Sequence, residues 1–178
     1  MMKKTLLAVM TAAALASGVA QAIDYPAGTI NFSGSIVPTT CAFTINGVEG
    51  TVDVDLGKIA ISDFSGINSK SPSTPLTIAA TGCPTSATAV TLTLGQSNDA
   101  DNINSDYFAN TGTNPATGVA IEVLTAADAA VVPGTSTDPV TVNNGAFSIP
   151  LTAQIVQTTI TAPMEGAVSA TVAVSVVY

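Results

Sequence analysis

The 178-residue chain contains no histidine, arginine or tryptophan, and only four lysines. Without histidine it lacks the usual proton shuttle of enzymes and the commonest metal ligand in proteins. Four lysines without arginine provide no basic surface for nucleic acid. These absences predict a protein that is not an enzyme, does not bind nucleic acid, and needs neither a metal ion nor a small-molecule cofactor.

What the chain does contain is mostly small and apolar. Hydrophobic residues make up 47% of the sequence, charged residues only 9%, and the formal net charge is −8. This high hydrophobic fraction and low charge density exclude a disordered chain. The length fits one domain behind a removable segment.

Residues 1–22 have the three parts of a secretory signal peptide. Lys3 and Lys4 precede an apolar run over residues 5–19, and Ala20-Gln21-Ala22 supplies a small-x-small cleavage pattern. The alternative is a membrane anchor, but a run of about 15 residues is shorter than the ~20 that span a bilayer. We expect cleavage after Ala22 and export of a chain with two lysines against twelve acidic residues.

The exported chain has two cysteines, Cys41 and Cys83. In an oxidising compartment such a pair is expected to form a disulfide. Without histidine, a tetrahedral zinc site would lack ligands and a nucleophilic cysteine would lack its base. A bridge closing this loop is worth roughly 4 kcal/mol in the chain-entropy model.

Apolar and polar residues alternate along most of the chain, which is typical of half-buried strands. The clearest runs are residues 29–33, 51–56, 89–94, 119–123 and 147–151. In residues 51–56, Asp53 and Asp55 face away from the apolar side. Asn46-Gly47, Pro133-Gly134 and residues 143–145 provide turns. About seven such strands indicate an antiparallel sandwich, with a long loop over residues 97–118 and a helical turn only at 62–67.

The two ends of the exported chain carry strands without an obvious partner. From residue 168 every second residue is apolar up to the C-terminus, and no strand follows that could cover the edge. The apolar positions are Val168, Ala170, Val172, Val174, Val176 and Tyr178. Open edges of long apolar strands are aggregation hazards. At the other end, Gly28, Ile30 and Phe32 lie on one side of a spare strand, which could pair within its own chain or with a neighbour's.

Four segments together resemble the chaperone–usher family of fimbrial subunits, and in particular the type 1 fimbrial major subunit. Residues 28–37, followed by Cys41, resemble the N-terminal extension and first strand of the family. Residues 54–57 resemble the next short strand, and residues 75–84 resemble the strand that ends in the second cysteine. Residues 166–178 resemble the C-terminal strand, although Tyr178 is the last residue, whereas in many relatives a tyrosine is penultimate.

The resemblance implies an all-β fold: an incomplete immunoglobulin-like antiparallel sandwich that lacks its seventh strand. It divides the chain into a signal peptide (1–22), an N-terminal extension that serves as donor strand (23–36) and a pilin domain (37–178). A donor strand from a neighbouring subunit completes the sandwich. Gly28, Ile30 and Phe32 are then the donor residues.

The resemblance also implies partners and a location. These partners are identical or related pilin subunits, a periplasmic immunoglobulin-like chaperone and an outer-membrane usher. The chaperone would recognise the C-terminal strand through Val172, Val174, Val176 and Tyr178. The chain would pass through the periplasm to the cell surface and form a fimbria that supports bacterial adhesion.

Other interpretations remain beside this one. The chain could be a minor adaptor or single-domain adhesin of the same family, or an unrelated exported enzyme or inhibitor that folds alone as a complete sandwich. Asp99, Asp101 and Asp106 form a loop rich in oxygen atoms that could bind calcium. Their spacing does not fit an EF-hand, so we expect a solvated loop.

Overall fold

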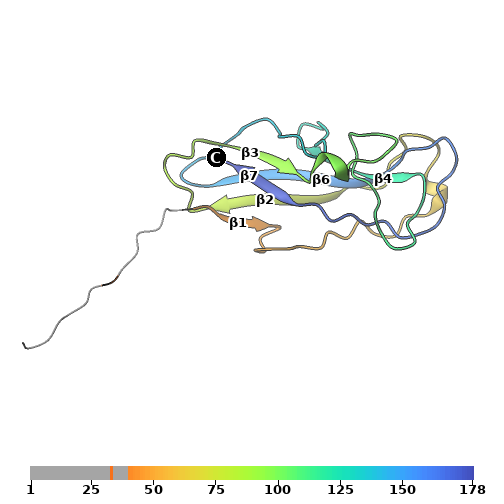
Figure 1. The fold of residues 1–178 in the computed structure, drawn as a ribbon, viewed down its shortest axis with the longest axis horizontal. Coiled ribbons are helices and arrows are strands. Elements are labelled where there is room, and N and C mark those ends of the chain that lie inside the picture. The colour runs from red at the N-terminus through yellow and green to blue at the C-terminus, as the bar shows by residue number, and fades with distance from the viewer. Residues whose placement is uncertain (1–32, 34–39) are drawn as a thin grey trace, which may run out of the picture. The chain divides into compact units, whose positions relative to one another are not determined.

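A computed structural model describes residue 33 and residues 40–178, which fall almost entirely within the compact unit Val37–Tyr178 (Figure 1). The described part contains seven strands, none of which is the donor strand that the resemblance assigns to a neighbouring subunit. They are β1 (Ala42–Ile45), β2 (Thr74–Thr81), β3 (Ala89–Leu94), β4 (Val119–Thr125), β5 (Val140–Thr141), β6 (Phe147–Gln157) and β7 (Val174–Val177). The strands predicted at 89–94, 119–123 and 147–151 are therefore confirmed.

The strands form two antiparallel sheets, which confirms the predicted all-β class. One sheet has the order β1-β2-β6-β4 and the other the order β5-β3-β7. Figure 1 shows β3 and β7 side by side along the second sheet. Alternating apolar side chains from both sheets meet in one core, which includes Ile78, Leu92 and Phe147. Cys41 and Cys83 are joined by the predicted disulfide and belong to this core.

The first sheet contains a β-bulge that lengthens β2 along β6. Lys70 lies opposite Val156 and Thr74 lies opposite Ala153. Residues 71–73 therefore face only residues 154 and 155 of β6, which leaves one extra residue on the β2 side. In place of a backbone carbonyl, the Ser71 hydroxyl accepts a hydrogen bond from the Ile155 N–H at 2.9 Å. Bulges of this kind bend a strand and increase its twist.

Two predicted turns have the backbone that hairpins favour. Asn46 and Gly47 have φ values of 51° and 79°, and Asn144 and Gly145 have values of 50° and 71°. Such pairs of positive φ values define type I′ turns, which match the twist of the flanking strands. Of the helical turn predicted at 62–67, only residues 62 and 63 are helical, within the 3-10 helix η1 (Ile61–Asp63). A second 3-10 helix, η2 (Ser97–Asp99), was not predicted and opens the predicted loop.

Two strand predictions are wrong in extent. Residues 51–56 are not assigned to a strand, and the C-terminal strand spans only Val174–Val177 instead of 168–178. Both segments keep the predicted alternation, with Val52, Val54 and Leu56 half-buried and Asp53 and Asp55 exposed. A strand is defined by its hydrogen-bonded neighbour, and the described residues provide no neighbour between these two segments.

Within residues 40–178, no helix combines the length and apolar character needed to cross a membrane.

Candidate functional site: an open groove beside the C-terminal strand

The described part of the chain contains a groove of about 770 Å³. One wall is the segment 52–59 and the other is the segment 163–174. Core side chains form its floor. These floor residues are Leu76, Ile78, Leu94, Phe108, Ile121, Val123, Ala153 and Ile155. The groove therefore opens directly onto the hydrophobic core.

The walls present their apolar side chains to this core without covering them. Val168, Ala170 and Val172 pack against buried core residues, as does Leu56 from the opposite wall, and all four are only half-buried. In a complete sandwich such side chains would be shielded by an adjacent strand. Their partial exposure indicates space for one more element.

The groove continues toward the opposite end of β7 as a smaller hollow of about 270 Å³. Phe43 and Ile45 of β1 line one side, Val174 and Val176 of β7 line the other, and Ile78 lies in the lining of both hollows. β1 and β7 are each the last strand of their own sheet. The continuous opening thus runs between the two sheet edges.

Among the described residues, the backbone of the C-terminal segment is hydrogen-bonded on one side only. The C=O groups of Ala167 and Ser169 accept from Ala116 and Thr111, and the C=O of Ala173 accepts the Gly95 N–H at 2.7 Å. The intervening Val168, Ala170 and Val172 have no backbone partner among the described residues. Because successive backbone groups of a strand point to opposite edges, these free groups face the groove.

The same alternation extends along β7. Leu92 of β3 lies opposite Val176 of β7, but its backbone is turned toward Thr137 on the other side of β3: the Leu92 N–H donates to the Thr137 hydroxyl and the Leu92 C=O accepts the Thr137 N–H. Val176 therefore makes no backbone hydrogen bond with Leu92. Val168, Ala170, Val172 and Val176 therefore combine an apolar side chain that packs against the core with a backbone edge that has no partner among the described residues. That combination is what an added β-strand requires: main-chain bonds for affinity and pockets for alternate side chains.

The structure places three of the four predicted C-terminal site residues, Val172, Val174 and Val176, along this opening, whereas Tyr178 lines neither hollow. Val172 and Val176 are half-buried, Val174 is 39% exposed, and Tyr178 lies beyond the end of β7 with 47% of its surface exposed. The predicted donor residues Gly28, Ile30 and Phe32 lie outside the described residues.

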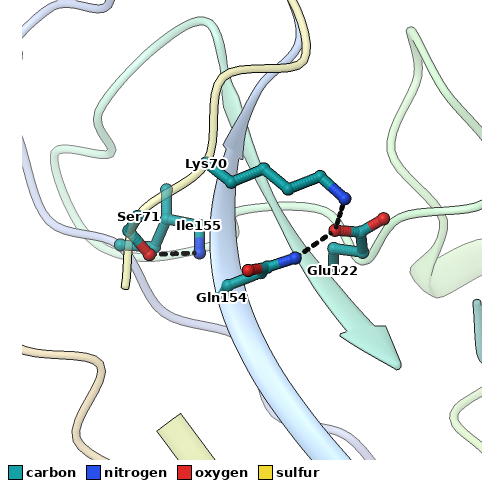
Figure 2. Close-up of polar contacts among 5 residues, drawn as sticks. All are labelled: Lys70, Ser71, Glu122, Gln154 and Ile155. Atoms are coloured by element: carbon teal, nitrogen blue, oxygen red, sulfur yellow. Dashed lines mark hydrogen bonds and ion pairs between the residues drawn. The ribbon is translucent and has the colours of Figure 1, made fainter. Parts of the chain in front are cut away.

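A polar cluster that the sequence did not reveal includes Glu122 and Gln154, which alternate with the core residues Ile121, Val123 and Ala153 and so lie on the opposite face of the first sheet. Figure 2 shows the contacts of this cluster. Glu122 of β4 is buried and accepts hydrogen bonds from Gln154 at 2.6 Å and from the Lys70 ammonium at 2.7 Å. Tyr107 is also buried and packs with Ala120 and Val156 on this face. Burial, and then the negative charge of Glu122, raise the pKa of the Tyr107 phenol.

The loop acids bond to their own loop. The Asp99 carboxylate accepts the Gln96 N–H at 2.7 Å, and the Asp101 carboxylate accepts the N–H groups of Ile103 and Asn104. These bonds to backbone donors shape turns. The residues described by the structure contain no group of three acidic, cysteine or histidine side chains arranged to hold a metal ion.

Comparison with known proteins agrees with this geometry. The family model for "Fimbrial protein" matches residues 30–178. A probable major fimbrial subunit LpfA of Escherichia coli O157:H7 is 36% identical over 84 residues, 47% of this chain and 46% of the relative. The S-fimbrial adhesin protein SfaS of Escherichia coli O6:K15:H31 is 36% identical over 104 residues, 58% and 55% of the two chains. The chain thus spans about half the length of these curated relatives.

Solved structures share the fold. The P pilus rod subunit PapA superimposes with a TM-score of 0.62 at 24% identity, covering 77% of this chain and 99% of that chain. A type I fimbria protein of Burkholderia pseudomallei gives 0.55 at 26% identity, covering 84% and 94% of the two chains. Because the family match spans far more than half of the sequence, the chain belongs to the fimbrial protein family.

Proposed function

We propose that the protein is a structural subunit of a surface fimbria, without catalytic activity, that polymerises head-to-tail by exchanging a donor strand. The observation that carries this proposal is the groove, where a half-covered core lies beside a backbone edge with free hydrogen-bonding groups. The occupant is the segment 23–36 of the next copy. Its alternating Gly28, Ile30 and Phe32 fit the period of two that a strand in this groove requires.

Apolar burial and main-chain pairing both favour this occupant. Fully burying a side chain such as Ile30 or Phe32 contributes about 1.5–3 kcal/mol. The groove and the extension are different surfaces of one molecule, so the contact between copies does not close on itself. Such head-to-tail contacts generate filaments.

Before assembly the exposed edge would be an aggregation hazard. We therefore expect a periplasmic immunoglobulin-like chaperone to cover the groove along Val172, Val174, Val176 and Tyr178, and an outer-membrane usher to pass subunits on to the growing fimbria. Signal-peptide cleavage after Ala22 would free residues 23–36 to act as the donor, ahead of a pilin domain at 37–178.

The test compares the exported chain with a self-complemented chain, in which a flexible linker and a second copy of residues 23–36 follow Tyr178. We expect the self-complemented chain to be a stable monomer, and the unaltered chain to self-associate or unfold when purified without a chaperone. Size-exclusion chromatography and thermal denaturation measure both properties. An unaltered chain that is already a monomer with high thermal stability would refute donor-strand assembly.

Abundance separates the rod subunit from the alternative of a minor adaptor or single-domain adhesin. Quantitative mass spectrometry of purified fimbriae should find this chain as the main component if it forms the rod.

A further inference from the structure

The groove wall at residues 164–172 lacks the support that β3 gives to the rest of the C-terminal segment. β3 pairs with residues 174–177 and ends at Leu94, and the Gly95 N–H makes the last bond, to Ala173. The loop 110–117 takes over the same edge further along. Its backbone bonds Ala167 and Ser169, and Met164 donates to Thr117 at 3.2 Å.

Asn110 holds this loop and the groove wall together through its side chain. Its amide nitrogen donates to the C=O of Ala167 at 2.8 Å and to the C=O of Ala116 at 3.0 Å. Its carbonyl oxygen accepts the Ser169 N–H at 2.9 Å. The Ala167 C=O is shared with the Ala116 N–H, whereas Asn110 is the partner of the Ser169 N–H among the described residues. One carboxamide thus completes the loop-side bonding of residues 167 and 169.

The loop and the wall approach closely enough to need glycine. A Cβ placed on Gly166 would collide with the backbone nitrogen of Ala116, and one on Gly112 would lie 2.7 Å from the Ser169 hydroxyl. The contact at Gly166 is with backbone and leaves no room for a side chain, whereas the Ser169 hydroxyl could turn away from a side chain at position 112. The loop backbone therefore lies directly against the groove wall at Gly166.

We propose that Asn110 is a positioning residue for strand uptake, an inference that rests on the proposed function. By fixing the loop-side bonds of Ala167 and Ser169, it presents the groove-side N–H and C=O of Val168 and Ala170 in register before a donor arrives. A wall that is ordered in advance avoids the ordering cost at the moment of binding.

The test uses the exported full chain, purified as its chaperone complex and released by dilution immediately before it is mixed with a fluorescent synthetic peptide of residues 23–36. We expect Asn110→Asp and Asn110→Ala to slow peptide association on the order of tenfold, with a much smaller change in the dissociation rate. The Asn110→Asp variant keeps the acceptor for Ser169 but loses both donors and sets a carboxylate against two carbonyl oxygens. Asn104→Ala is the matched control, because the Asn104 side chain accepts only the Asp106 N–H within its own loop.

The outcomes separate the two proposals. If the unaltered chain takes up no peptide, the proposed function fails. If the unaltered chain takes it up and both Asn110 variants do so at the same rate, the positioning role is wrong. If Asn110 only stabilised the fold, its variants would lose thermal stability as strongly as they lose association rate. That result would also overturn the positioning role.

Hydrogen exchange on the unaltered chain, released from its chaperone complex in the same way, gives a test that does not depend on any variant folding. We expect the Ser169 and Ala167 amides to be protected before peptide is added, and the Val168 and Ala170 amides to become protected only afterwards. Equal exchange of all four amides in the free chain would contradict the proposal.

Discussion

Among single residues, burial of Tyr107 beside Glu122 makes this phenol one contributor to the stability of the domain at alkaline pH. The pKa of Tyr107 is raised mainly by burial and then by the Glu122 carboxylate, while Lys70 opposes the change. The folded protein therefore holds the proton more tightly than the unfolded chain, in which a tyrosine titrates near pH ~10. The resulting stability is present below that pH and is lost as the pH rises through the folded pKa.

Tyr107→Phe should remove this dependence. In the self-complemented chain, we expect the unaltered protein to lose thermal stability above about pH 10, and the variant to lose less of it over the same range. Thermal denaturation monitored by circular dichroism between neutral and alkaline pH measures the difference. Tyr178→Phe is the control, since Tyr178 is half exposed at the chain end, and it should behave like the unaltered protein.

Gly28 is the residue at which we expect assembly and folding to separate. If residues 23–36 enter the groove of a neighbour, a large side chain at position 28 would collide with its walls. We predict that Gly28→Leu is exported and forms the Cys41–Cys83 bridge normally but yields no filaments. Electron microscopy of cells that produce the variant checks this, and a filament yield equal to that of the unaltered chain would remove Gly28 from the donor role.

At the level of secondary-structure elements, successive residues of the C-terminal segment lie on opposite faces, one toward the core and one toward solvent. Val172 is half-buried and packs against the core, whereas its neighbour Thr171 is exposed on the opposite face. A substitution at one position should therefore disturb the groove, and the same substitution one residue earlier should not. A shift of one residue moves a side chain to the other face of a strand.

Val172→Asp and Thr171→Asp form a matched pair for this prediction. We expect Val172→Asp to destabilise the self-complemented chain by about 2 kcal/mol or more, because it loses apolar burial and places a charge beside the core. Thr171→Asp should change stability by less than about 0.5 kcal/mol. Urea denaturation of both variants provides the comparison, and equal losses would mean that the two faces are not distinct.

Across the whole molecule, the Cys41–Cys83 disulfide joins the start of β1 to the chain just beyond the end of β2. Replacing both cysteines by alanine should cost about 4 kcal/mol in the chain-entropy model. We expect a lower yield of exported subunit and a lower urea midpoint for the self-complemented chain. An unchanged midpoint would show that the core alone fixes these two strands.

Much of the fold was accessible from alternation and turn residues, because both depend on nearest neighbours along the chain. Ala89–Leu94 and the Asn144-Gly145 turn are examples. Residues 51–56 show where this reasoning ends. Their side chains alternate as predicted, yet no ladder forms, since a ladder depends on a neighbour that the pattern does not specify.

The candidate site divides in the same way. The one-sided apolar face from Val168 to Val176 could be read directly from spacing, and so could the cysteine pair. The Asn110 contacts could not, because Asn110 and Ser169 lie far apart in sequence and an asparagine in an Asn-rich loop carries no distinguishing signal. The Lys70–Glu122 ion pair was hidden for the same reason.

Composition, the signal-peptide pattern and period-two alternation are local properties of the sequence. They were enough to predict that the chain is exported, that it is all-β, that its two cysteines form a disulfide and that an apolar strand lies at its C-terminus. That this strand borders an open groove became visible only in three dimensions. Which strand edges meet and which stay free depends on contacts between residues far apart in the chain. β1 and β7 end their respective sheets, and the hollow between those edges leaves the core half covered.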